Sequence, residues 1–230
     1  MKKKIYILHG WAYNLDKWQP IIKLLKDDGI EAVMLKVPGL TKPSDKVWDL
    51  DKYVDWLHGE LQKVAKPVVL VGHSNGGRIS MGLASKYPNM IDKLVLIDSA
   101  GIYHNEPRLR LKRAVFGGAA KLGKRLSRSK RMRRVLYKLA RAQDYHDAPP
   151  NMRETMANLG RDDAKLDPST IKTPTTIIWG KYDTLTPLTD AKLLHDKIAG
   201  SKLTVIQEAR HAPFYTHPQK VLEIIKHSAL

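Results

Sequence analysis

Six short apolar runs, separated by segments of helical periodicity, are the feature that most constrains the fold of this 230-residue chain. Each run is nearly continuous in apolar residues, which is typical of strands buried on both faces of a parallel sheet. The predicted strands lie at 5–8, 30–37, 68–71, 94–97, 175–179 and 203–206, and amphipathic helices are predicted at 18–25, 47–64, 75–86, 187–199 and 218–227. This alternation predicts an α/β fold, a mostly parallel six-stranded sheet with helices on both faces. Thr186 and Pro187 are predicted to open their helix as its N-cap and first turn.

Length indicates one compact domain, or one domain that carries a sizeable insertion, because domains average about 150 residues. The chain has no cysteine, which excludes a disulfide scaffold, thiol catalysis and any thiolate metal site. The three lysines at 2–4 are followed by only four apolar residues, too short a run for a signal peptide, and no later run approaches the length of a membrane span. We therefore expect a soluble, cytoplasmic protein.

The net charge of +17 is concentrated in one stretch, which we call the basic segment, residues 102–146. It holds fourteen lysines and arginines against Glu106 and Asp144, a net charge of +12. Helical spacing predicts an amphipathic helix at 129–141 and suggests a shorter one at 109–116. Helices inserted after the fourth strand would cover the carboxyl ends of the sheet, where ligands bind. We expect 1–101 and 171–230 to form the core and 102–170 to form a helical lid.

Three interpretations of this charge remain open. The first is a solvated helical face, and the second is attraction of an anionic substrate by a positive rim. The third is weak contact with a polyanion, such as nucleic acid, or with an anionic membrane. Phe116 and Tyr137 are the aromatic residues among the cations, which weakens the argument for base stacking. The oligomeric state is not predicted.

The strongest local motif is Gly72-His73-Ser74-Asn75-Gly76-Gly77, placed between an apolar strand and a helix. A Gly-x-Ser-x-Gly sequence on such a turn exposes its serine in a strained backbone, and its glycines allow neighbouring backbone to pass close by. The structural alternative is an ordinary glycine-rich connection. A phosphate-binding P-loop is excluded, because no Lys-Ser or Lys-Thr follows the glycines.

With this motif the chain resembles the α/β-hydrolase superfamily over nearly its whole length. That superfamily places its residues in the order serine, acid and histidine, the acid after the penultimate strand and the histidine after the last. Here Trp179-Gly180-Lys181-Tyr182-Asp183 and Glu208-Ala209-Arg210-His211 follow those two strands. The resemblance therefore implies a catalytic triad of Ser74, Asp183 and His211.

The resemblance also implies a mechanism. His211 would take the proton of Ser74 and return it to the leaving group, while Asp183 would fix the imidazole tautomer. The backbone N–H groups of Trp11 and Asn75 would form the oxyanion hole, and the indole of Trp11 would line the acyl pocket. No cofactor and no metal enter this chemistry.

Several residues compete for these roles. Asp98, after the fourth strand, is the alternative acid. His195 lies within a helix, His217 precedes a proline as a cap, and His73 is interpreted as a packing residue. Arg210 departs from the superfamily, which usually has glycine before the catalytic histidine. It would cost of order 1 kcal/mol if that backbone required a positive φ, or it would place a charge near the site.

We therefore expect a lidded serine hydrolase acting on a small carboxylic ester, thioester or lactone. Hydrolysis of a carbon–carbon bond remains open, because relatives with the same triad catalyse it. The alternative from another class is a receptor that keeps the triad and uses its lid as a ligand-operated switch. Turnover of a chromogenic ester distinguishes an enzyme from a receptor.

Overall fold

The computed structural model describes residues 4–65, 67–103 and 148–229, and within them it confirms the predicted parallel sheet. The strand order is β2-β1-β3-β4-β5-β6, and every neighbouring pair is parallel. The strands are β1 (Lys4–Leu8), β2 (Glu31–Leu35), β3 (Val68–His73), β4 (Ile91–Ile97), β5 (Thr175–Gly180) and β6 (Lys202–Ile206). The helices are α1 (Gln19–Asp27), α2 (Leu50–Gln62), α3 (Asn75–Lys86), α7 (Pro150–Asp162), α8 (Leu188–Lys197), α9 (Pro213–Thr216) and α10 (Pro218–Ala229).

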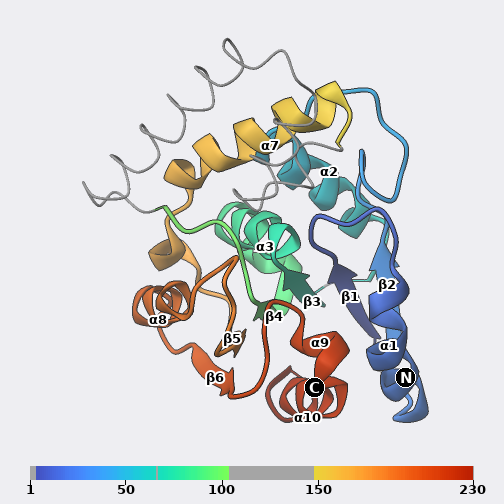
Figure 1. Cartoon of the computed structure of the whole chain (residues 1–230), viewed down its shortest axis with the longest axis vertical. Helices are drawn as coiled ribbons and strands as arrows, with labels where there is room; N and C mark the ends of the chain where they lie inside the picture. Colours follow the sequence, from blue (N-terminus) through green and yellow to red (C-terminus); the bar gives the residue numbers. More distant parts are fainter. Residues whose placement is uncertain (1–3, 66, 104–147, 230) are drawn as a thin grey trace, which may run out of the picture.

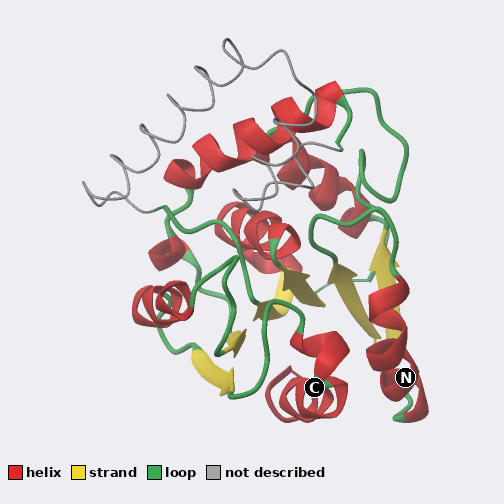
Figure 2. Cartoon of the chain, in the orientation of Figure 1, coloured by secondary structure: helices red, strands yellow, loops and turns green. Residues whose placement is uncertain are grey.

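Helices cover both faces of the sheet, as the apolar runs predicted (Figure 1). One hydrophobic cluster joins α2, α3 and α8 to one face through residues such as Leu57, Ile79 and Leu194. A second cluster joins α1 and α10 to the other face through Ile21 and Val221. Figure 2 shows the strands enclosed between these helical layers. None of the helices in the described part of the chain is long and apolar enough to cross a membrane.

Helix α2 begins later than the apolar spacing suggested. The carboxylate of Asp49 accepts a hydrogen bond from the backbone N–H of Lys52 at 2.8 Å and so caps the helix. Capping satisfies one of the backbone donors that the first turn leaves without a partner. The segment before Asp49 is therefore loop, although its valine continues the apolar periodicity.

The strand order places the ends of several strands at one edge. The order reverses between β1 and β3, and ligands of open α/β sheets bind at the carboxyl ends beside such a reversal. The loops that follow β1, β3, β5 and β6 all leave from this edge, because the strands are parallel. These are the loops that carry the predicted site residues.

Between β4 and β5 the chain contains the predicted insertion, whose residues 104–147 lie outside the described part. The helices predicted at 109–116 and 129–141 fall there, so the boundaries of 102–170 remain a prediction. The described end of the insertion holds α7, a helix that the sequence analysis did not predict. Figure 1 shows α7 above α2 and α3.

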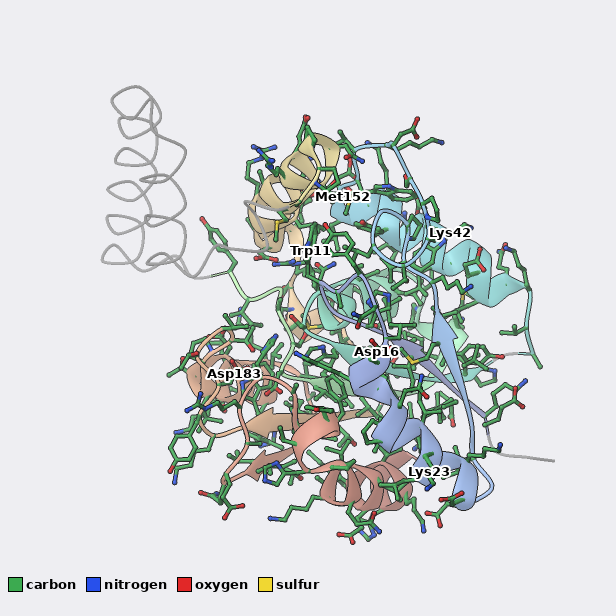
Figure 3. All side chains as sticks on the ribbon, turned by 45° about the vertical axis from the view of Figure 1, so that its right-hand side comes forward. Trp11, Asp16, Lys23, Lys42, Met152 and Asp183 are labelled. Atoms are coloured by element: carbon green, nitrogen blue, oxygen red, sulfur yellow. The ribbon has the colours of Figure 1, made fainter. Side chains whose placement is uncertain are left out.

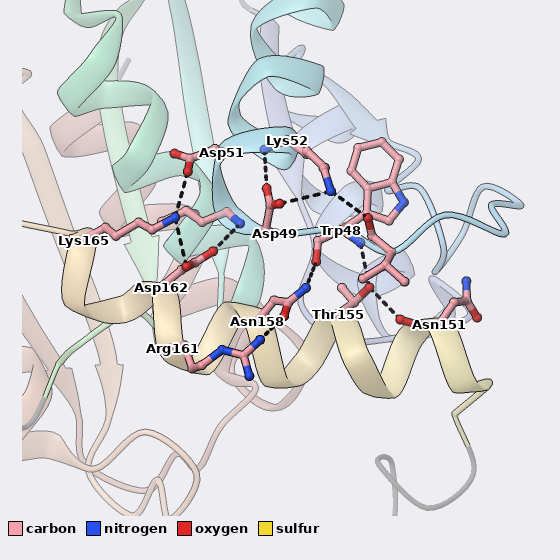
Figure 4. Close-up of polar contacts among 12 residues, drawn as sticks. Trp48, Asp49, Asp51, Lys52, Asn151, Thr155, Asn158, Arg161, Asp162 and Lys165 are labelled. Carbon is pink, nitrogen blue, oxygen red and sulfur yellow. Dashed lines mark hydrogen bonds and ion pairs between the residues drawn. The ribbon is translucent and has the colours of Figure 1, made fainter.

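Polar groups dock α7 onto the loop before α2 (Figure 4). The buried face of α7 mixes Met152 and Leu159 with Thr155 and Asp162. The hydroxyl of Thr155 accepts from the backbone N–H of Trp48 at 2.9 Å, and the carboxylate of Asp162 accepts from the first N–H of α2 at 3.1 Å. Because half of this face is polar, its hydrophobic periodicity is weak, which is why the helix was missed.

Candidate active site

Ser74 occupies a strained turn between β3 and α3. Its φ of 52° and ψ of −119° lie where residues other than glycine are rarely found. A Cβ on Gly76 would lie 2.0 Å from the carbonyl oxygen of Leu8, and one on Gly10 would lie 2.9 Å from the Cβ of Ser74. The end of β1 therefore passes against the serine turn, and a side chain on Gly76 would force the two apart.

The structure brings Ser74, His211 and Asp183 into one hydrogen-bonded chain. The Nε2 atom of His211 lies 3.0 Å from the hydroxyl of Ser74, and its Nδ1 atom lies 2.7 Å from the Asp183 carboxylate. An ionised carboxylate only accepts hydrogen bonds, so Nδ1 carries the proton and Nε2 is free to accept from the serine. This is the arrangement that activates a serine as a nucleophile.

Asp183 is held as a charged group by several donors. The backbone N–H groups of Leu185 and Thr186 donate to one oxygen at 2.7 and 3.1 Å. His211 and the hydroxyl of Thr186 donate to the other at 2.7 and 2.6 Å. Burial by itself raises the pKa of Asp183, but the hydrogen bonds, led by that of His211, outweigh it and hold the pKa below its ordinary value.

The prediction that Thr186 is an N-cap is wrong. Helix α8 begins at Leu188, its N-cap position is Pro187, and no side chain caps it. The hydroxyl of Thr186 points to Asp183 instead. The hydroxyl donates to a charged acceptor at 2.6 Å, one of the stronger kinds of hydrogen bond, and this holds the side chain against Asp183. Thr186 is a site residue that the sequence analysis missed.

His73 packs behind His211. Its Nε2 donates to the backbone carbonyl of His211 at 2.7 Å, and its ring contacts the rings of Trp18 and Phe214. Burial, reinforced by the neighbouring His211, lowers the pKa of His73 to about 3. His73 is therefore neutral and orients the loop of His211, which agrees with its interpretation as a packing residue.

The two residues predicted for the oxyanion hole flank Ser74. Asn75 follows it directly, and Trp11 follows Gly10, whose backbone contacts the serine. Within the described residues, no acceptor is hydrogen-bonded to the backbone N–H of either Trp11 or Asn75. Figure 3 shows Trp11 below Met152 of α7, and its indole packs against the cluster that contains Met152. Trp11 thus lies between the serine turn and the inserted helix.

The side chain of Asn75 is tied to the end of the insertion. Arg78 donates to its amide oxygen at 2.7 Å and forms two hydrogen bonds with the Asp163 carboxylate, at 2.7 and 3.1 Å. Both charged side chains are largely buried, 14% and 13% exposed, so solvent screens this ion pair little. The contact fastens the segment after α7 to the first turn of α3.

Asp98, the alternative acid, lies near the site but faces another partner. It is fully buried, and its Oδ1 accepts from the backbone N–H of Gly180 at 2.8 Å. The Nδ1 atom of His211 is instead paired with Asp183. The geometry therefore favours Asp183 as the acid.

The remaining predicted competitors lie outside this chain of hydrogen bonds. His195, in α8, bonds to the hydroxyl of Ser201, and His217 lies between α9 and α10 beside Thr216. Arg210 is exposed and carries no strain, since Ser74 and Asp98 are the non-glycine residues with positive φ in the described part of the chain. It lines an open cleft of about 710 Å³ together with Lys181 and Asp183. Arg210 thus places a charge beside the acid loop.

One cluster has the composition of a metal site. Ligand atoms of His73, Asp98 and His211 lie within 4.8 Å of one another. However, His73 donates through Nε2, and both ring nitrogens of His211 are paired with Asp183 and Ser74. A metal would have to displace those hydrogen bonds, so the donor set fits proton transfer better than metal binding.

Comparison with known proteins identifies the family of the fold and several similar proteins. A family model described as alpha/beta hydrolase fold matches residues 3–218. The chain is 27% identical to pimeloyl-[acyl-carrier protein] methyl ester esterase of Neisseria meningitidis serogroup B, over 94% of this chain and 89% of that protein. It is 26% identical to human monoacylglycerol lipase ABHD6, over 97% and 74%. The enol-lactonase of Burkholderia xenovorans LB400 has a similar fold, with a TM-score of 0.71 at 17% identity over 99% and 91% of the chains.

Proposed function

Because the chain belongs to the alpha/beta hydrolase fold family, we propose that it is a serine hydrolase that cleaves a small carboxylic ester, thioester or lactone through an acyl-enzyme. The observation that carries this proposal is the hydrogen-bonded chain from Ser74 through His211 to Asp183. The names of its relatives support the bond type, since one is an esterase of a methyl ester and another a lipase of monoacylglycerols.

In the first half of the reaction the hydroxyl of Ser74 attacks the ester carbonyl, and Nε2 of His211 takes its proton. The carbonyl oxygen becomes negative and is received by the backbone N–H groups of Trp11 and Asn75, each worth about 2.7–4 kcal/mol of transition-state stabilisation. His211 then protonates the leaving alcohol. In the second half, water attacks the acyl-enzyme and gives its proton to His211, which returns it to Ser74 as the bond to the acyl group breaks and the acid product leaves. Asp183 stabilises the imidazolium in both halves.

A panel of p-nitrophenyl esters with increasing acyl length, a matched thioester and a lactone tests this function. We expect turnover of at least one of these substrates by the wild-type protein and none above background by Ser74→Ala. If none of these substrates is turned over, turnover of a β-diketone in a separate assay would replace the ester assignment by carbon–carbon bond hydrolysis. Saturable ligand binding without turnover of any substrate would favour the receptor alternative.

The charge of the basic segment gives a second, independent expectation. If its net charge of +12 steers an anionic substrate, kcat/KM for anionic esters should fall with added salt, whereas kcat/KM for neutral esters should not. The Debye length shrinks from about 10 Å at 0.1 M salt to about 3 Å at 1 M, which screens the attraction. Replacing Arg131, Arg133 and Arg134 together by Gln should have the same effect as salt.

The same measurements separate the other interpretations of this charge. Retention on heparin to high salt, with anionic and neutral esters behaving alike, would assign the charge to a polyanion. If retention on heparin is weak, and salt changes kcat/KM for neither anionic nor neutral esters, the basic segment is a solvated face.

A further inference from the structure

Asp98 contacts the end of β5 and the loop that carries Asp183 at three points. Its backbone N–H donates to the carbonyl of Ile178 at 3.0 Å, and its Oδ1 accepts from the N–H of Gly180 at 2.8 Å. Its backbone carbonyl lies 3.2 Å from the hydroxyl of Thr186, the group that also bonds to Asp183. Ile178 and Gly180 lie at the end of β5, and Thr186 ends the acid loop, residues 181–186. Two of the three contacts use the backbone of Asp98, so its carboxyl group acts on the position of the loop through the hydrogen bond from Gly180.

The backbone of Asp98 is itself in an uncommon conformation. Its φ is 42°, in the left-handed region that aspartate and asparagine tolerate better than most residues. The other non-glycine residue of the described chain with a positive φ is Ser74. Strained backbone of this kind persists where surrounding contacts determine it, and it is concentrated at functional sites.

The carboxyl group of Asp98 lies in surroundings that disfavour a charge. Its side chain is fully buried, and its Oδ2 atom has no hydrogen-bond partner among the described residues. The titratable groups around it are Asp183, His211 and His73, from the loops after β5 and β6 and from β3. Burial first, and then the charge of Asp183, raise the pKa of Asp98 to about 8 against the single opposing hydrogen bond from Gly180.

Asp98 and Asp183 thus differ in the number of donors that they meet. Asp183 receives four hydrogen bonds and keeps its charge, whereas Asp98 receives one. Two neighbouring carboxyl groups cannot both ionise cheaply, and because both side chains are buried, the one that meets more hydrogen-bond donors takes the charge.

We propose that Asp98 is a positioning residue that anchors the acid loop as an uncharged carboxylic acid, leaving Asp183 as the charged partner of His211. The proposal rests on the proposed function, because the position of Asp183 affects the rate only if His211 is the base. In this role Asp98 supplies an acceptor for Gly180 without adding a second negative charge to the site.

The charge of Asp98 can be measured through stability, by comparing the free energies of unfolding of the wild-type protein and Asp98→Asn between pH 4 and 9. An unfolded aspartate loses its proton near pH 4, whereas the folded one keeps it to about pH 8. In this window unfolding of the wild type releases a proton that the variant lacks. We therefore expect the ratio of the two unfolding constants to shift in favour of the variant by up to about tenfold per pH unit, and to level off above pH 8.

A ratio that stays constant above about pH 5 would show that folded Asp98 is ionised at neutral pH and would overturn the proposal. This measurement needs no catalytic activity. It therefore decides the charge of Asp98 even if the wild-type protein turns over no ester, thioester or lactone, which is the outcome that would refute the proposed function.

The positioning role is tested by kcat at pH 7 in two variants. Asp98→Gly removes the side chain and tolerates the positive φ, whereas Asp98→Asn keeps an uncharged acceptor for Gly180. We expect Asp98→Gly to lower kcat by about 10- to 100-fold with KM little changed, and Asp98→Asn to restore kcat to within about threefold of the wild type. Equal losses in both variants would mean that the carboxylate charge is required, and wild-type kcat in Asp98→Gly would mean that no positioning occurs. Either result overturns the proposal.

Discussion

Replacing Ser74 by Ala is expected to lower kcat by roughly 10³–10⁶-fold and to abolish covalent labelling by a fluorophosphonate. The variant keeps the backbone donors of Trp11 and Asn75 but has no hydroxyl within 3.0 Å of His211 to form the acyl-enzyme. Labelling is measured by intact-protein mass spectrometry and kcat by ester hydrolysis.

Ser169→Ala is the matched control, because Ser169 is exposed in the short 3-10 helix Pro168–Thr170 and its hydroxyl is hydrogen-bonded to Asp167, outside the hydrogen-bonded chain of Ser74. This variant should be labelled by the fluorophosphonate and should hydrolyse the ester with the same kcat as the wild type. If Ser74→Ala remained active and the label appeared on another serine, the nucleophile would be assigned to the wrong residue.

Asp183→Asn is expected to keep the fold and lower kcat by up to about 10⁴-fold. The asparagine would present an amide N–H, or a neutral oxygen, to the Nδ1 atom that now donates to a carboxylate at 2.7 Å. The imidazole would lose the tautomer that leaves Nε2 free for Ser74, and its protonated form would lose its counter-charge. Circular dichroism and kcat on the same preparation separate a loss of fold from a loss of catalysis.

Asp98→Asn is the natural comparison, because it makes the same chemical change at the other acid of the site. Its effect should be much smaller. If Asp98→Asn abolished activity while Asp183→Asn were mild, the acid would be the residue after β4, and the hydrogen bond between His211 and Asp183 would be without catalytic importance.

The architecture and the candidate nucleophile could be predicted from the sequence because they depend on local patterns. Continuous apolar runs specify strands buried on both faces, and their alternation with amphipathic segments predicted the parallel sheet. The glycines around Ser74 predicted a sharp turn, and the structure shows the reason, since Gly76 leaves no room for a Cβ beside Leu8. The positions of Asp183 and His211 after their strands followed from chain order combined with the resemblance to a known family.

Other features depend on residues far apart in the chain, and only the tertiary structure decided them. In helix α7, Thr155 and Asp162 accept hydrogen bonds from backbone N–H groups more than 100 residues earlier, and these polar residues on the buried face weaken its hydrophobic periodicity. An aspartate followed three residues later by a threonine, as at Asp183 and Thr186, is a pattern compatible with a local hydrogen bond. That pattern alone does not show whether the threonine caps a helix or bonds to the acid.

The difference in charge between the two carboxyl groups is likewise decided by the tertiary structure. Asp98 and Asp183 each follow a strand of the sheet, so local sequence predicts no difference between them. Both side chains are buried, so their different charges arise from the donors that folding supplies, four to Asp183 and one to Asp98. Strand order brings both acids to one edge of the sheet, but hydrogen bonding and desolvation, which exist only in the folded chain, determine which of them is charged.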